Sequence, residues 1–81
     1  MSKPYAFTQY APVTKSDDPE DNFAEPTRAI WVGGAGDLAV IPRAGANPIV
    51  LTNVPAGTLL PIAVIRVHST GTDASDVVAL N

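Results

Sequence analysis

A glycine-rich segment in the first half of the chain has the clearest chemical meaning. Residues 30–40 read Ile-Trp-Val-Gly-Gly-Ala-Gly-Asp-Leu-Ala-Val. They fit the loose G-x-G-x-x-A pattern of dinucleotide loops. In such loops glycine has no Cβ, so the backbone can approach a pyrophosphate bound at a helix N-terminus. No helix of useful length can begin here, because residues 37–41 have the alternating pattern of a β-strand and Pro42 follows directly. A dinucleotide site also needs a carboxylate about 20 residues further on to hold the ribose, and the chain has no Asp or Glu between Asp37 and Asp73. We therefore interpret the segment as the turn of a tight β-hairpin.

The single histidine, His68, lies in a polar loop with hydroxyl and carboxyl side chains. These neighbours are Ser69, Thr70, Thr72, Asp73 and Asp76. Nucleophilic catalysis needs a hydroxyl next to a base that a third group orients. Side chains this close in one loop usually face different ways, so we predict no catalytic site and no enzyme.

A second group of chemically useful residues is acidic. Asp17, Asp18, Glu20 and Asp21 could supply paired carboxylates or weak calcium ligands. Their setting is solvated, and the D-x-D-x-D-G spacing with its terminal Glu is absent. The chain also has no cysteine for a thiolate site. We predict neither a metal site nor a cofactor.

Charge divides the chain into two parts. The net charge of −3 lies entirely in residues 1–25, and residues 26–81 are neutral. We therefore expect an acidic, aromatic arm over 1–25 and one β-domain over 26–81. The chain has no basic stripe for nucleic acid, no apolar run of membrane length and no signal-peptide pattern, so we expect neither a nucleic-acid nor a membrane partner.

The aromatic residues identify candidate contact surfaces. Four of the five, Tyr5, Phe7, Tyr10 and Phe23, lie in the arm. A purely solvating tail is normally poor in aromatics, so the arm either folds back onto its own domain or lies along a neighbouring subunit. The fifth, Trp31, is either a core anchor or an interface anchor. All five are candidate contacts to a neighbouring subunit or to a larger assembly.

From Thr27 onward, short β-type runs alternate with turn signals. We predict strands at 28–33, 36–42, 48–52, 58–67 and 76–80. The fold class is all-β: a small antiparallel β-sandwich or open barrel of about five to six short strands, with an extended N-terminal arm. The run 58–67 is apolar on both faces, so both should be covered, and Pro61 should mark a strand start, a bulge or an outward position. A domain this small without disulfides or metal commonly oligomerises.

Four segments carry a resemblance to a known family. They are 31–40 (Trp-Val-Gly-Gly-Ala-Gly-Asp-Leu-Ala-Val), 53–62 (Asn-Val-Pro-Ala-Gly-Thr-Leu-Leu-Pro-Ile), Arg66-Val67 and 71–80 (Gly-Thr-Asp-Ala-Ser-Asp-Val-Val-Ala-Leu). In order and spacing, residues 28–80 resemble the head spike base proteins of gene transfer agents (GTAs) and related alphaproteobacterial tailed phages. The resemblance does not extend to residues 1–25.

The resemblance implies a structural virion protein, made in the bacterial host cytoplasm and mounted on the capsid surface at the vertices as the base of a spike or fibre. It implies a homo-oligomeric ring, with a pentamer favoured and a trimer possible, that contacts the major capsid protein and the spike or fibre protein. It supplies no catalytic residues. The shared turn and strand-end residues are Gly33, Gly34, Gly36, Pro55, Gly57, Pro61 and Gly71.

Two other classes remain open at this point. A capsid cement or decoration protein, typically trimeric, would share the composition and the arm. A receptor- or glycan-binding β-module usually exposes aromatics in its loops, whereas loops 43–47, 53–57 and 68–75 contain none. That absence counts against the binding module.

Overall fold

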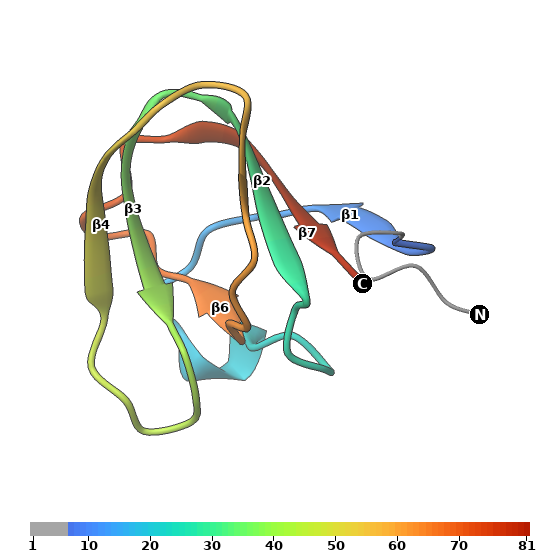
Figure 1. Ribbon diagram of the computed structural model, residues 1–81. Helices are drawn as coiled ribbons and strands as arrows, with labels where there is room; N and C mark the ends of the chain where they lie inside the picture. Colours follow the sequence, from blue (N-terminus) through green and yellow to red (C-terminus); the bar gives the residue numbers. More distant parts are fainter. Residues whose placement is uncertain (1–6) are drawn as a thin grey trace.

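The computed structural model describes residues 7–81 and forms two antiparallel β-sheets packed face to face (Figure 1). Sheet A has the strand order β1-β7-β2-β5, and sheet B has the order β4-β3-β6. The elements are β1 (Tyr10–Pro12), the short 3-10 helix η1 (Pro19–Asp21), β2 (Ala29–Gly34), β3 (Gly36–Ile41), β4 (Ile49–Val54), β5 (Thr58–Leu60), β6 (Arg66–Val67) and β7 (Ser75–Leu80). The predicted all-β, antiparallel fold is confirmed.

The core lies between the two sheets and follows from the alternation of side chains along each strand. On β2, Ile30 and Val32 are fully buried, whereas Trp31 between them faces outward and is 40% exposed. The largest fully buried side chains are Ile30, Val32, Leu38, Val64 and Val67. Aliphatic packing between the layers therefore holds the sandwich together.

The glycine-rich segment does not form the predicted hairpin. β2 belongs to sheet A and β3 to sheet B, so the chain turns a corner between the sheets at Ala35. A Cβ on Gly36, whose φ is +154°, would lie 2.7 Å from the backbone N of Ala74. The carbonyl of Asp37 accepts hydrogen bonds from the N–H groups of Asp73 (2.8 Å) and Ala74 (3.1 Å). The prediction was wrong because a corner that packs on another backbone segment needs small residues as much as a hairpin turn does.

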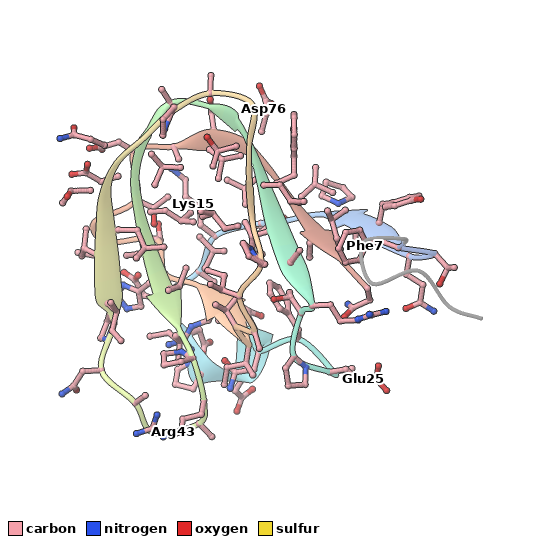
Figure 2. All side chains as sticks on the ribbon, viewed as in Figure 1. Phe7, Lys15, Glu25, Arg43 and Asp76 are labelled. Atoms are coloured by element: carbon pink, nitrogen blue, oxygen red, sulfur yellow. The ribbon has the colours of Figure 1, made fainter. Side chains whose placement is uncertain are left out.

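A β-hairpin does connect β3 and β4. Their register pairs Val40 with Ile49 and Leu38 with Leu51. In the connecting turn, the N–H of Ala46 donates to the carbonyl of Arg43 (3.1 Å), and Gly45 has a φ of +79°. Figure 2 shows Arg43 at this lower end of the molecule and Asp76 at the opposite end.

The predicted strand 58–67 was also wrong as one element, because it divides into β5 in sheet A and β6 in sheet B. Pro61 has no N–H for a ladder, and pairing stops directly before it. Beyond it, the Thr27 hydroxyl donates to the carbonyl of Ile62 (2.9 Å) and accepts from the N–H of Val64 (3.0 Å). The run is apolar throughout because it crosses from one sheet to the other, with Val64 in the core.

The predicted arm contributes a strand that the sequence did not indicate. β1 pairs with β7 in the register Tyr10–Leu80, Ala11–Ala79 and Pro12–Val78. Further along, the N–H groups of Ser16 and Phe23 donate to the carbonyls of Val67 (3.0 Å) and Ile65 (2.7 Å). Residues 8–23 are thus fastened to their own domain, which is the first of the two alternatives for the arm.

Candidate functional site

One candidate contact surface crosses the outer face of sheet A. The strand registers place Pro12, Val78, Trp31 and Leu59 side by side, one residue from each strand. Paired residues of antiparallel strands point to the same face, so these four form an apolar row, here called the outer stripe. Trp31 and Leu59 are 40% and 39% exposed. An uncharged row with an exposed indole is typical of a protein-binding surface.

Two glycines flank the Trp31 ring. A Cβ on Gly33 would lie 3.7 Å from the indole Nε1, and one on Gly57 would lie 3.9 Å from Cη2. Asp76 lies next to Gly33 at this end of the sheet. Because Trp31 faces outward, its interpretation as a core anchor is wrong, and interface anchoring stays a prediction.

The aromatic residues of the arm have different surroundings. Tyr5 lies outside the described residues. Phe7 lies below the Arg28 guanidinium, at 5.7 Å from ring centroid to Cζ, and its carbonyl accepts from the Tyr10 hydroxyl (2.5 Å). Tyr10 is 68% exposed on the edge strand β1, whereas Phe23 packs against the core. Among the three arm aromatics that the structure describes, Tyr10 is therefore the most available to a partner.

A second candidate surface lies on β4, the outermost strand of sheet B. Ile49 and Val50 are 53% and 47% exposed, and no residue of Ile49–Val54 is charged. β4 pairs with β3 on one side only, so the other side of its backbone has no strand partner among residues 7–81. We call Ile49, Val50 and this free backbone side the β4 edge. The sequence predicted a strand here, but a strand's position in its sheet is set by tertiary pairing.

The polar cluster around His68 fastens the arm. Asp17 accepts hydrogen bonds from the amide (2.8 Å) and hydroxyl (2.6 Å) of Thr70 and lies 3.2 Å from Nδ1 of His68. The bonds from the hydroxyl and amide of Thr70 lower the pKa of the Asp17 carboxyl. Sequence reasoning considered Asp73 and Asp76 as partners of His68 and missed Asp17, because 53 residues separate Asp17 from Thr70.

Several of the hydroxyl and acidic groups singled out in the sequence make structural hydrogen bonds. Thr72 is buried, and its hydroxyl donates to the carbonyl of His68 (2.6 Å) and accepts from the N–H of Ala39 (2.9 Å). In the acidic segment, Asp18 accepts from the N–H of Glu20 (3.0 Å) and so caps η1. Among residues 7–81, no three His, Asp or Glu side chains are grouped as metal ligands.

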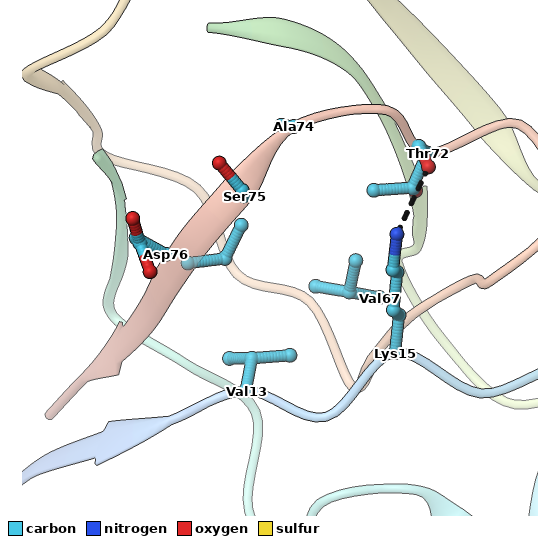
Figure 3. Close-up of a pocket in the computed structure, with 8 residues that line it drawn as sticks. Val13, Lys15, Val67, Thr72, Ala74, Ser75 and Asp76 are labelled. Atoms are coloured by element: carbon cyan, nitrogen blue, oxygen red, sulfur yellow. Dashed lines mark hydrogen bonds between the residues drawn. The ribbon is translucent and has the colours of Figure 1, made fainter. Parts of the chain in front are cut away.

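A cavity of about 200 Å³ separates the arm from the start of β7 (Figure 3). Val13, Val67 and Val77 form apolar walls, and the Lys15 ammonium donates to the carbonyl of Thr72 (3.3 Å) across it. A wider groove of about 520 Å³ lies between β1 and residues 23–27. Within residues 7–81, no helix has the length and apolar character needed to cross a membrane.

The chain is similar to a known protein of a GTA capsid. It superimposes on a chain from the capsid of a native GTA particle computed with C5 symmetry, with a TM-score of 0.80 and 30% sequence identity. The match covers 94% of this chain and 84% of the other. The chain belongs to a family of GTA capsid proteins.

Membership of the GTA capsid family gives the chain a structural role in the virion, where it assembles with the capsid. The resemblance seen in residues 28–80 is confirmed at this level, as a GTA or phage virion protein. No family model and no curated protein sequence matches the chain.

Proposed function

We propose that copies of this chain form a ring at the capsid vertices and serve as the base on which a spike or fibre is mounted. One observation carries the proposal: the similar chain is part of the capsid of a GTA particle, and that capsid as a whole was computed with C5 symmetry. Fivefold symmetry is the symmetry of a capsid vertex, and a ring matched to it has five copies. The resemblance of residues 28–80 to head spike base proteins supports the same position.

The surfaces of the domain suit this role. A vertex protein must contact its own copies, the major capsid protein and the spike or fibre protein, so it needs more than one binding surface. The outer stripe and the β4 edge lie on different sheets, and each exposes large apolar side chains. The acidic arm over 1–25 would add a capsid contact, and repetition of weak contacts around a ring raises the overall affinity.

The test is a reconstruction of particles with and without the gene for this chain. Density that is present only in the wild-type particles and only at the vertices is the expected result. Density over the whole lattice, at a much higher copy number, would make the chain a cement or decoration protein. If intact, purified particles lack the chain altogether, it has no role as a vertex base.

The proposal that the chain carries a spike or fibre has its own measurement. Particles without the chain should keep their capsid and lose the vertex spikes or fibres, because the base would be missing. Re-expression of the full chain is the control and should restore them. Retention of the spikes on particles without the chain would refute the base function even if the chain lies at the vertices.

A further inference from the structure

The exposed apolar residues lie in two separate places on the molecule. Among residues 7–81, the large exposed hydrophobic side chains are Tyr10, Trp31, Ile49, Val50 and Leu59. Trp31 and Leu59 belong to the outer stripe with Tyr10 beside it, whereas Ile49 and Val50 belong to the β4 edge. In Figure 1, β4 forms the left margin of the molecule, and β2, β7 and β1 lie on the right.

We propose that copies of this chain associate head to tail, with the β4 edge of one copy seated on the outer stripe of the next. This inference rests on the ring under the proposed function and names the surfaces that build it. A two-fold dimer uses the same patch on both copies, so it would cover one of the two surfaces and leave the other exposed. A head-to-tail contact uses both surfaces of every copy, and it closes into a ring when the rotation between copies permits.

The β4 edge is the sheet edge most open to a partner. The edge of β6 is covered by the arm, because Ser16 and Phe23 donate to backbone carbonyls at Val67 and Ile65. The two edge strands of sheet A have three residues each, and a proline blocks each of them: Pro12 within β1 and Pro61 directly after β5. Short strands and prolines protect edges from unwanted pairing. β4 has six residues with no proline and no charge.

The outer stripe has the composition that this edge requires. It is uncharged and contains the only tryptophan of the chain. Tryptophan is enriched at the centres of binding surfaces because it combines a large apolar area with one N–H donor. Ile49 and Val50 are consecutive in β4 and point to opposite faces of sheet B, so on the outer stripe of the next copy they would lie on either side of the β4 backbone. The indole Nε1–H of Trp31 could then donate to a free carbonyl of that backbone.

Paired cysteines test this contact cleanly, because the natural chain has none. The variants are Val50→Cys and Leu59→Cys, alone and together, and particles that carry each variant are oxidised and analysed without reductant. The double variant should give a ladder of covalent multimers that ends at the ring size. Neither single variant should give a covalent dimer. Ser69→Cys with Leu59→Cys is the matched control and should give no ladder.

Particle incorporation of each variant is measured first, so that failure to fold is recognised. If Val50→Cys is not incorporated, Ile49→Cys replaces it. A covalent dimer from Val50→Cys alone would mean that two β4 edges meet, and one from Leu59→Cys alone would mean that two outer stripes meet. Either result, or an incorporated double variant without a ladder, would overturn the proposal.

The same oxidation on the purified chain separates this inference from the proposed function. A ladder in solution supports the head-to-tail contact even if reconstruction finds the chain away from the vertices. Val50→Glu should weaken self-association by at least about tenfold, since it places a charge in an apolar contact. Ala63→Glu, at an exposed site outside both surfaces, is the control and should self-associate as the wild type does.

Trp31 fluorescence gives a second readout of the same variants. Because Trp31 is the only tryptophan, its emission should shift to shorter wavelength as the wild type associates and stay unshifted for Val50→Glu. Association of the wild type without any change in Trp31 emission would contradict a contact at the outer stripe.

Discussion

Thr27 connects two distant parts of the chain through one buried hydroxyl, and its replacement by valine should destabilise the domain. The side chain is 2% exposed. Its hydroxyl donates to the carbonyl of Ile62 at 2.9 Å and accepts from the N–H of Val64 at 3.0 Å. Valine keeps the shape of threonine and removes both bonds. The Val64 amide, beside a side chain that is only 1% exposed, would lose its partner inside the protein.

The size of the effect follows from the two groups left without a partner. A buried donor or acceptor without a hydrogen bond costs about 1–3 kcal/mol. Ile62 is half-buried and its carbonyl recovers part of that cost from water, so the sum is about 3 kcal/mol. For a domain of this size, that corresponds to a decrease in Tm of roughly 15 °C. Urea and thermal unfolding followed by circular dichroism, at one fixed protein concentration, measure both quantities.

Two variants serve as controls. Thr27→Ser keeps the hydroxyl, and the loss of one methyl group should cost about 1 kcal/mol. Thr52→Val, on the exposed side of β4, should change the free energy of unfolding by less than about 0.5 kcal/mol. If Thr27→Val also changes the free energy of unfolding by less than about 0.5 kcal/mol, the hydroxyl does not hold residues 61–65 in place where the chain passes from sheet A to sheet B.

Three further predictions concern the corner at Gly36, the hydrogen bonds between Asp17 and Thr70, and the packing of Phe23 against the core. Gly36→Ala should cost about 3 kcal/mol or more, because its Cβ would overlap the backbone at residues 73–74, whereas Gly45→Ala, with open space around its Cβ, should cost about 1 kcal/mol in urea unfolding. Thr70→Val should raise the pKa of Asp17, as measured by NMR titration, because the valine lacks the hydroxyl donor. Since the folded-state pKa of Asp17 is lowered, its stabilising effect should be complete above the usual aspartate pKa and disappear as the pH falls through the lowered value. Phe23→Ala should cost about 2 kcal/mol in thermal unfolding, because Phe23 packs against the core.

Each of these has an outcome that contradicts it. Equal losses for the two glycine variants would mean that the corner tolerates a Cβ. An unchanged Asp17 titration in Thr70→Val would mean that the hydroxyl bond does not form in solution. The conservative Phe23→Leu should cost less than about 1.5 kcal/mol, and a loss as large as that of Phe23→Ala would point to ring-specific packing instead of apolar burial.

The sequence determined the fold class, most strand positions and the family resemblance. Short apolar runs with turn residues between them predicted strands at 28–33, 36–42, 48–52 and 76–80, and β2, β3, β4 and β7 lie within about two residues of these ranges. These features are local, because side-chain alternation and proline and glycine geometry act over a few residues. The order and spacing of residues 28–80 also carried the resemblance to GTA and phage virion proteins.

Tertiary structure alone decided how these strands are combined. Whether Gly33–Gly36 forms a hairpin or a corner depends on which strands lie beside β2, and these are β7 and β5, both from later in the chain, instead of β3. Three other features depend in the same way on residues distant in sequence: the outward orientation of Trp31, the edge position of β4 in sheet B, and the hydrogen bonds between Asp17 and Thr70. Residues that are locally compatible with several arrangements take the one that buries the most apolar surface and satisfies the buried backbone groups, and that choice is made over the whole chain.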